Sequence, residues 1–279
     1  MLYGLELPGY ELPEEAMAPT LAVKNRVKRM VQDGQRTAGA WLQIASPFTA
    51  EILARAGFDW LLIDMEHGPG DILTLVSQLQ AMNGTGVAPL VRAPWNDFVT
   101  IKRILDTGVC GLLVPYVNTG EEAQAAVRAC RYPPHGIRGV AGSPRAQGYG
   151  QHVRQYLEQA NDEILLLTAV ETPTAVENLG EILSVDGVDG LFIGPMDLAT
   201  NMGHLGDPGH QRVQATIAKI EEKVLGAGKV LATISGSWEQ AQRLYDRGYQ
   251  MIMLMADGVS LAKLAAEKVA QFREAYPGG

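Results

Sequence analysis

Two acidic residues, Glu171 and Asp197, each follow a short apolar run typical of a β-strand, and each precedes a segment with helical character. The two runs cover residues 164–170 and 190–194. Carboxylates at the ends of successive strands are the hard oxygen ligands that a divalent cation prefers, and two of them leave coordination positions open for water and substrate. An acidic residue after a strand is also a common helix N-cap. The pattern therefore predicts a divalent-metal site, with helix capping as the alternative for either residue alone.

Other ionisable side chains are expected at the same rim. His67 follows a further strand-like run, with Asp64 and Glu66 close by in the sequence. A carboxylate that fixes the tautomer of an imidazole and raises its basicity turns a histidine into a proton shuttle, so we predict that Asp64 orients His67. Arg92 ends the next run, and its planar guanidinium suits a carboxylate or enolate oxygen. The alternative for His67 is a structural histidine, and the alternative for Arg92 is a structural ion pair.

The turn that carries Asp197 adds a possible anion site. Gly194, Pro195 and Met196 lead into a helix-like segment, and the backbone N–H groups at a helix N-terminus bind small anions without a lysine. A metal, an arginine and exposed amides together describe a site for a 2-oxo acid. No lysine stands at these strand ends to form a Schiff base, so we expect a metal to withdraw electrons from the substrate.

The elements that must hold these residues alternate along the chain. The 279 residues offer eight strand candidates separated by helix candidates, which predicts a parallel (β/α)₈ (TIM) barrel whose chemistry lies at the C-terminal strand ends. A doubly wound sheet is the main competitor, but no G-x-G-x-x-G follows the first strand. Residues 1–20 are predicted to be an extension, and residues 21–279 a single barrel domain that begins with a helix. The strand candidates are 38–44, 60–64, 87–92, 111–117, 164–170, 190–194, 229–234 and 251–255.

Composition narrows the class of protein. A formal net charge of −8 without blocks of like charge argues against nucleic acid as a partner. No apolar stretch is long enough for a membrane span, and the acidic N-terminal residues do not resemble a signal peptide, so we expect no membrane partner and a cytoplasmic location. Cys110 and Cys130 are expected to be two reduced thiols rather than a disulfide.

Several motifs together resemble one known family. They are FDWLLIDMEHG at 58–68, WND at 95–97, LLVP at 112–115, YPP at 132–134, RG at 138–139, VDG at 188–190 and GPMDL at 194–198. From about residue 25 to its end, the chain resembles the HpcH/HpaI family of class II pyruvate aldolases. SPRA at 143–146 and MGHLG at 202–206 are similar to segments of the 2-dehydro-3-deoxyglucarate aldolases, which with the 4-hydroxy-2-oxoheptanedioate aldolases are the nearest members.

The resemblance implies an assembly, a cofactor and residue roles. It implies a hexamer, a dimer of trimers, with the last helix exchanged between subunits. Glu171 and Asp197 would bind Mg²⁺, Mn²⁺ or Co²⁺, Arg92 would stabilise the pyruvate enolate, and His67, oriented by Asp64, would move the proton of the aldol hydroxyl. The remaining site residues it implies are Trp41, Gly194, Pro195 and Met196 against the substrate, with Glu66 and Asp106 behind them.

Two positions depart from the family pattern. Ala169 stands where the family usually has glutamine, and Met196 stands where relatives have a small or polar residue. The first change loses an amide near the pyruvate site and the second adds bulk beside the carboxylate-binding turn. Neither removes an expected metal ligand, and the loop 139–150 leaves the aldehyde open.

The expected reaction is reversible cleavage of a 4-hydroxy-2-oxo acid to pyruvate and an aldehyde. One alternative keeps the site but uses oxaloacetate, in decarboxylation, citrate formation or macrophomate-type synthesis. A second alternative is a non-catalytic barrel that binds a 2-oxo acid.

Overall fold

The structure, a computed structural model, describes residues 24–277, and within them eight parallel strands close into a barrel in the order β1 to β8. The predicted (β/α)₈ fold is confirmed. The predicted extension, 1–20, and its boundary at residue 21 lie outside the described residues. The strands are β1 (Thr37–Leu42), β2 (Trp60–Asp64), β3 (Ala88–Arg92), β4 (Gly111–Val114), β5 (Leu165–Val170), β6 (Gly190–Ile193), β7 (Val230–Ile234) and β8 (Met251–Ala256).

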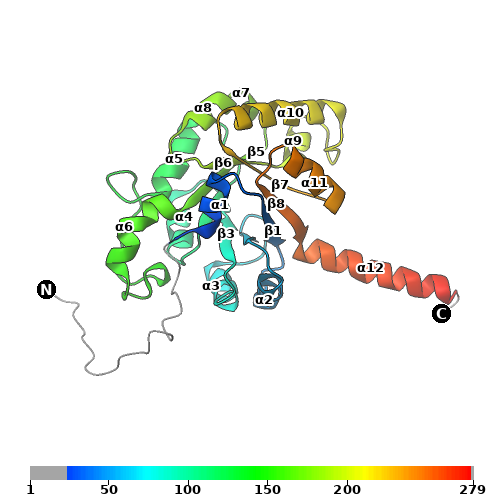
Figure 1. Cartoon of the computed structure of the whole chain (residues 1–279), viewed down its shortest axis with the longest axis horizontal. Coiled ribbons are helices and arrows are strands. Elements are labelled where there is room, and N and C mark those ends of the chain that lie inside the picture. The colour runs from blue at the N-terminus through cyan, green and yellow to red at the C-terminus, as the bar shows by residue number, and fades with distance from the viewer. Residues whose placement is uncertain (1–23, 278–279) are drawn as a thin grey trace, which may run out of the picture.

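Helices surround the barrel and join its strands (Figure 1). Several of them start at a short polar side chain that accepts a hydrogen bond from the first helical turn, as Ser46, Asp97 and Ser237 do. The helices are α1 (Arg26–Gln32), α2 (Pro47–Arg55), α3 (Ile72–Ala81), α4 (Phe98–Leu105), α5 (Gly120–Cys130), α6 (Val153–Glu163), α7 (Pro173–Glu177), α8 (Leu179–Ser184), α9 (Pro195–Asn201), α10 (Gln211–Gly226), α11 (Trp238–Asp246) and α12 (Asp257–Ala275), with a 3₁₀ turn, η2 (Arg145–Gln147).

Strand side chains alternate between two apolar layers, because successive residues of a strand point to opposite faces. Inward-facing residues such as Leu62, Leu90 and Phe192 fill the barrel, and α1 adds Val27 and Val31 to the same cluster. Outward-facing residues pack beneath the helices. The barrel is therefore solid, and its chemistry must lie at an open end rather than in a channel.

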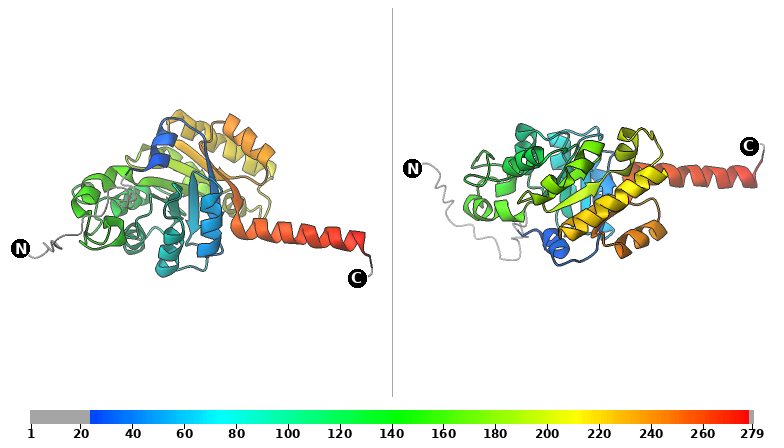
Figure 2. Two further views of the ribbon diagram at one scale, coloured as in Figure 1. Left: turned by 60° about the horizontal axis from the view of Figure 1, so that its bottom comes forward. Right: turned by 90° about the horizontal axis from the view of Figure 1, so that it is seen from above.

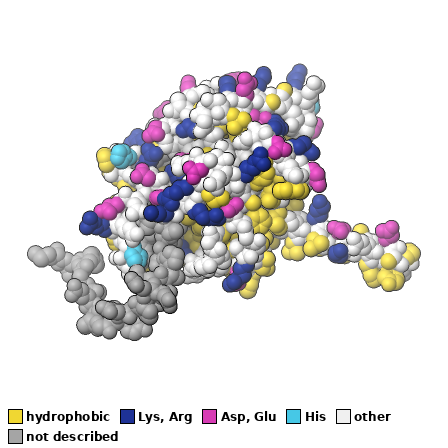
Figure 3. Space-filling model, viewed as in Figure 1, with side chains coloured by type: hydrophobic (Ala, Val, Ile, Leu, Met, Phe, Trp, Pro, Cys, Tyr) yellow, Lys and Arg dark blue, Asp and Glu magenta, His cyan; other side chains and the backbone are white. Residues whose placement is uncertain are grey.

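The last helix differs from the others in its position. After its first turns beside β1 and β8, α12 projects away from the barrel in both views of Figure 2. Figure 3 shows hydrophobic side chains along it and over the adjoining side of the barrel. The large apolar residues exposed on α12 are Val259, Leu261, Leu264, Val269 and Phe272.

The sequence-based boundaries need several corrections, and the first strand stops at Leu42 rather than at residue 44. The fourth strand stops at Val114 rather than 117, and the polar segment after the loop 139–150 contains α6, which no helix candidate covered. Within residues 24–277, no helix has both the length and the hydrophobicity needed to cross a membrane.

Candidate active site

The C-terminal strand ends enclose a cavity of about 660 Å³. It contains most of the predicted site residues, although they come from strands far apart in the sequence. This is the end of a parallel barrel where functional loops meet. The predicted residues that line the cavity are Trp41, His67, Arg92, Glu171, Gly194, Pro195, Met196 and Asp197.

Arg92 is held rigidly at the floor of this cavity. Strand register pairs Asp64 with Arg92, the last residues of β2 and β3. The guanidinium donates from Nε to Asp64 Oδ1 at 3.0 Å and from Nη2 to Oδ2 at 2.6 Å, and its Nη1 lies 2.9 Å from Glu66 Oε2. Its central carbon also lies 4.5 Å from the ring centre of Trp41. Arg92 is only 4% exposed, so this bidentate, stacked arrangement fixes one orientation.

Asp64 has a different partner from the predicted one. Its Oδ1 accepts hydrogen bonds from the backbone N–H groups of Glu66 and His67, at 3.0 and 3.1 Å, while both oxygens hold Arg92. Burial raises the pKa of Asp64, but hydrogen bonds and charge from Arg92 outweigh it, so the pKa lies below its usual range. Asp64 therefore anchors the arginine and the turn, and it does not contact the imidazole.

The His67 side chain is 64% exposed, in the cavity wall. Its Nε2 lies 4.0 Å from Glu66 Oε2. Burial raises the pKa of Glu66, and Arg92 and His67 partly offset that effect. Glu66, which was expected only to support the site from behind, is thus the carboxylate nearest the imidazole.

The two expected metal ligands line the same cavity as His67, and the charge of Asp197 reaches Glu171. Glu171 is 2% exposed, and its Oε2 accepts a hydrogen bond from the Tyr116 N–H at 3.1 Å. A Cβ at Gly194 would lie 2.8 Å from Glu171 Oε1, so only glycine lets the β6–α9 turn come this close. That turn carries Asp197 in the first turn of α9.

These two carboxylates fit a divalent cation. No Lys, Arg or His side chain within residues 24–277 lies within 4.0 Å of either one. Burial raises the pKa of Glu171 to about 7, and the charges of Asp197 and Glu66 raise it further, against the Tyr116 N–H and Arg92. No group of three or more His, Cys, Asp or Glu is arranged for a metal in the described chain. Two protein oxygens would thus leave the other positions to water and substrate, as an open catalytic site requires.

Asp106 does not join this site within the chain. Its Oδ1 accepts a hydrogen bond from Arg138 Nη2 at 2.9 Å, and Arg138 is fully buried against Tyr132 and Tyr156. This cluster anchors the chain at Arg138, immediately before the loop 139–150. Residues 139–143 of the loop are exposed, and residues 146–148 are buried. The role that the resemblance implies for Asp106 remains a prediction.

Some cavity residues were not anticipated. Gln43 donates from Nε2 to Asp64 Oδ2 at 3.3 Å, and Ser235 follows β7. Both occupy the first position beyond a strand end, as Glu171 does. The rule that located Glu171 would have found them if it had been applied to every strand. Gln240 and Lys263 come from helices, and no local pattern in the sequence indicated them.

Comparisons with known proteins show which family the chain resembles. The family model HpcH/HpaI aldolase/citrate lyase matches residues 37–263. The 4-hydroxy-2-oxo-heptane-1,7-dioate aldolase of Klebsiella pneumoniae is 44% identical over 250 residues, covering 90% of this chain and 94% of the relative. The hydroxypyruvate/pyruvate aldolase of Cupriavidus necator is 42% identical, over 91% and 94%. A crystal structure of an HpcH/HpaI aldolase/citrate lyase family protein from Burkholderia cenocepacia matches with a TM-score of 0.86 and 36% identity, over 90% of this chain and 100% of that one.

Proposed function

The chain belongs to the HpcH/HpaI aldolase/citrate lyase family and is an aldolase, and we propose that it is a divalent-metal-dependent one that reversibly cleaves a 4-hydroxy-2-oxo acid to pyruvate and an aldehyde. The observation that carries the proposal is the meeting of Glu171, Asp197, Arg92 and His67 in one cavity.

Glu171 and Asp197 would hold the metal, which we expect to be Mg²⁺, Mn²⁺ or Co²⁺. When bound, a divalent cation polarises the keto group of the substrate and supplies the electron sink that aldol cleavage needs. Asp197 belongs to the first turn of α9, and Gly194 lets that turn approach the buried Glu171. The protein thus keeps two hard oxygen ligands close together without a competing cation.

Arg92 would orient the carboxylate or keto oxygen of the substrate. A guanidinium has five N–H donors, and Asp64 accepts hydrogen bonds from two of them, while Nη1 forms an ion pair with Glu66. The other three N–H groups have no hydrogen-bond acceptor within residues 24–277, and Arg92 lines the cavity. Negative charge that develops on a substrate oxygen would meet a donor group already fixed in place, which lowers the barrier without reorganisation.

His67 would accept the proton of the C4 hydroxyl during cleavage and return it during synthesis. Its imidazole is exposed to the cavity, and the nearby Glu66 carboxylate can stabilise the imidazolium that forms. The buried apolar side chains of Trp41 and Phe192 line the same cavity and would exclude water from the pyruvate methyl carbon, whereas the more exposed Met196 would contact the aldehyde.

The experiment that tests the proposal avoids the unknown aldehyde. Exchange of the pyruvate methyl protons in D₂O would be followed by NMR with Mg²⁺ or Mn²⁺ and after chelation. We expect metal-dependent exchange in the wild type, none in Glu171→Gln or Asp197→Asn, and wild-type exchange in Glu222→Gln, an exposed carboxylate of α10. Exchange that survives chelation, or that persists in both ligand variants, contradicts the metal assignment.

A second assay identifies the reaction. Cleavage would be measured with 4-hydroxy-2-oxoheptanedioate, after the relative from Klebsiella, and with oxaloacetate. We expect pyruvate from the first substrate. Turnover of oxaloacetate alone would favour the decarboxylase or synthase alternative, and binding of pyruvate without exchange or turnover would favour the non-catalytic one.

The projecting α12 supports a proposal about assembly. We propose a homo-oligomer, a hexamer by family resemblance, in which α12 packs on a neighbouring subunit and buries residues such as Leu264 and Phe272. Light scattering should give an oligomer for the wild type and a smaller species for a variant with Leu264→Asp and Phe272→Asp. A monomeric wild type would contradict it. A cytoplasmic location also remains a prediction.

A further inference from the structure

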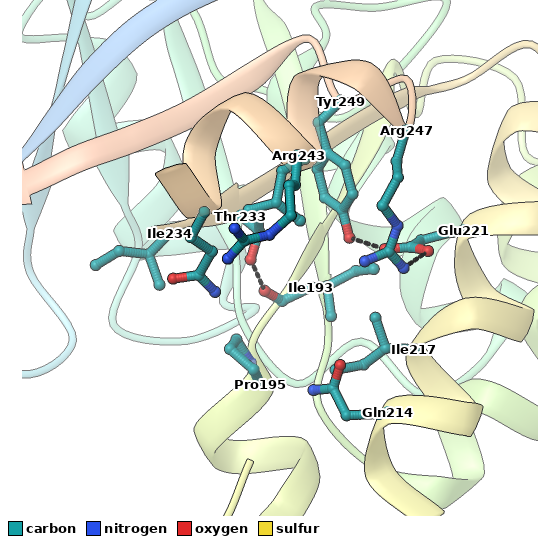
Figure 4. Close-up of a pocket in the computed structure, with 12 residues that line it drawn as sticks. Ile193, Pro195, Gln214, Ile217, Glu221, Thr233, Ile234, Arg243, Arg247 and Tyr249 are labelled. Atoms are coloured by element: carbon teal, nitrogen blue, oxygen red, sulfur yellow. Dashed lines mark hydrogen bonds and ion pairs between the residues drawn. The ribbon is translucent and has the colours of Figure 1, made fainter. Parts of the chain in front are cut away.

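A second cavity, of about 220 Å³, lies outside the barrel wall (Figure 4). Strands β6 and β7 form one side of it, and α10 and α11 form the other. None of the residues assigned to metal binding or proton transfer lines it. Its volume corresponds to about seven water molecules at roughly 30 Å³ each. It therefore suits a small molecule of a few carbon atoms and excludes a nucleotide.

Most polar groups of this cavity are already paired. Glu221, only 6% exposed, forms an ion pair with Arg247 and accepts a hydrogen bond from the Tyr249 hydroxyl at 2.7 Å. Thr233 donates its hydroxyl proton to the Ile193 carbonyl at 2.9 Å. These contacts, drawn in Figure 4, leave no unpaired carboxylate among the residues that line the cavity, so it offers no negative charge to a cationic ligand.

Arg243 is the exception. In the part of the chain that the structure describes, its guanidinium has no hydrogen-bond acceptor and no carboxylate within 4.0 Å; Glu239, one turn earlier on α11, lies beyond that distance. The charged groups that line the cavity are therefore Arg243, Arg247 and Glu221, which sum to one positive charge. A single negative charge is the complement, and a guanidinium binds a carboxylate through two parallel hydrogen bonds.

The rest of the wall is apolar. Ile193, Ile217 and Leu244 are buried side chains that contribute aliphatic surface. Inorganic phosphate would gain nothing from such a wall, whereas a short aliphatic chain would bury surface against it. The Arg243 guanidinium and the apolar wall together fit a monocarboxylate with a short apolar chain.

The second cavity also shares wall residues with the active-site cavity. Pro195, Ile234 and Gln240 line both cavities. Gln240 Oε1 accepts from the Gly236 N–H at 2.8 Å, and Gln214 Nε2 donates to the Pro208 carbonyl at 2.8 Å. Gly236 and Pro208 belong to the active-site wall. An occupant of the second cavity would thus touch two side chains, Gln214 and Gln240, that are hydrogen-bonded to the wall of the first.

We infer that the cavity between β6, β7, α10 and α11 is a second binding site, which takes a small monocarboxylate on Arg243 and is coupled to pyruvate binding through Gln214 and Gln240. The coupling acts in both directions, because an effector that changes the affinity for pyruvate must have its own affinity changed by the same factor. A product or substrate analogue of the active site would be a ligand of the right class.

Calorimetry with butyrate tests the site, since butyrate lacks the keto oxygen that chelates a metal. It would be titrated into the full-length protein without pyruvate, because pyruvate is itself a small monocarboxylate and would compete for the same site. We expect saturable binding, weakened at least tenfold in Arg243→Gln and in Ile217→Phe, which fills the apolar half. The matched control is Arg103→Gln, an exposed arginine of α4 that forms no ion pair in the described chain, and it should bind like the wild type.

Three results would overturn the inference: no saturable binding, equal binding by Arg243→Gln, or phosphate binding as tightly as butyrate. The coupling would be measured as the pyruvate dissociation constant with and without butyrate, and we expect a change of roughly fivefold or more that disappears in Arg243→Gln. An unchanged constant would overturn the coupling. These are binding measurements, so failure of the proposed aldolase reaction would leave them readable.

Discussion

Replacing Glu171 by Gln should stabilise the metal-free protein at alkaline pH, although it removes an expected metal ligand. Burial raises the pKa of Glu171 to about 7, against a usual value of 4.5. Above pH 7 the carboxylate is ionised in both the folded and the unfolded chain, so the buried charge lowers the free energy of unfolding. The difference of about 2.5 pH units corresponds to about 3 kcal/mol.

A carboxylate usually has a lowered pKa in the folded state and stabilises the folded protein at high pH. Glu171 has a raised folded-state pKa, so its ionisation has the opposite effect. The penalty is complete above pH 7, fades as the pH falls towards 4.5, and vanishes when the group is protonated in both states. Glutamine keeps the shape and can still accept the Tyr116 N–H, but it carries no charge. The variant should therefore be more stable than the wild type only at pH values at which the raised pKa of Glu171 destabilises the folded wild type.

Urea denaturation in the presence of a chelator would measure the effect. At about pH 8.5 we expect Glu171→Gln to be more stable than the wild type by about 3 kcal/mol, and at about pH 5 by less than about 1 kcal/mol. Glu222→Gln, on the exposed face of α10, should show no such pH dependence. Added Mn²⁺ should stabilise the wild type and not the Glu171 variant, because only a ligand that binds the folded state shifts the equilibrium. The reasoning is refuted if Glu171→Gln is no more stable than the wild type at alkaline pH without metal.

Three further substitutions have expected outcomes. Asp64→Asn leaves the buried Arg92 with Glu66 as its remaining carboxylate, and urea denaturation should show a free energy of unfolding lower by about 3 kcal/mol. Because the pKa of Asp64 is lowered in the folded protein, this difference should be complete at neutral pH and shrink as the pH falls through that pKa. Arg92→Lys should lower kcat/KM for aldol cleavage roughly 100-fold, since an ammonium cannot reproduce the bidentate fork, while calorimetric metal affinity stays unchanged. Met196→Ala, at a residue 52% exposed in the cavity wall, should leave pyruvate proton exchange intact and change the ratio of kcat/KM between a short and a branched aldehyde about tenfold. A loss of proton exchange in Met196→Ala would contradict its assignment to the aldehyde side.

The sequence predicted the rim of the barrel better than the contacts within it. Glu171, Asp197, His67 and Arg92 could be located because each follows or ends a strand, and every strand end of a parallel barrel opens on the same face. The partner of Asp64 could not be read in the same way. Sequence proximity favoured His67, three residues away, whereas strand register pairs Asp64 with Arg92 on the next strand. Contacts of that kind depend on register, which a single strand does not encode.

The missed helix has a related cause. In α6 only Tyr156 and Ala160 are buried, and the neighbouring residues are mostly polar, so the helical period is weak. Its position depends on the contacts of Tyr156 with Arg138, a buried residue that precedes the loop 139–150. Helix formation here rests on tertiary packing, and propensity alone does not reveal it.

The balance of charges in the cavity supports the proposal that a cation binds there before a 2-oxo acid. Asp64, Glu66, Glu171 and Asp197 surround a single guanidinium, Arg92. Asp64 accepts two hydrogen bonds from Arg92 and Glu66 forms an ion pair with it, whereas Glu171 and Asp197 form no ion pair within residues 24–277. Burial, with the charges of Asp197 and Glu66 added to it, raises the pKa of Glu171. Pyruvate is itself an anion and would be repelled by an ionised, metal-free pair. In the proposed function, a divalent cation would both replace the proton on Glu171 and supply the positive charge that an incoming carboxylate requires. The carboxylates that lower stability without a metal would thus favour binding in a fixed order, first the metal and then the acid.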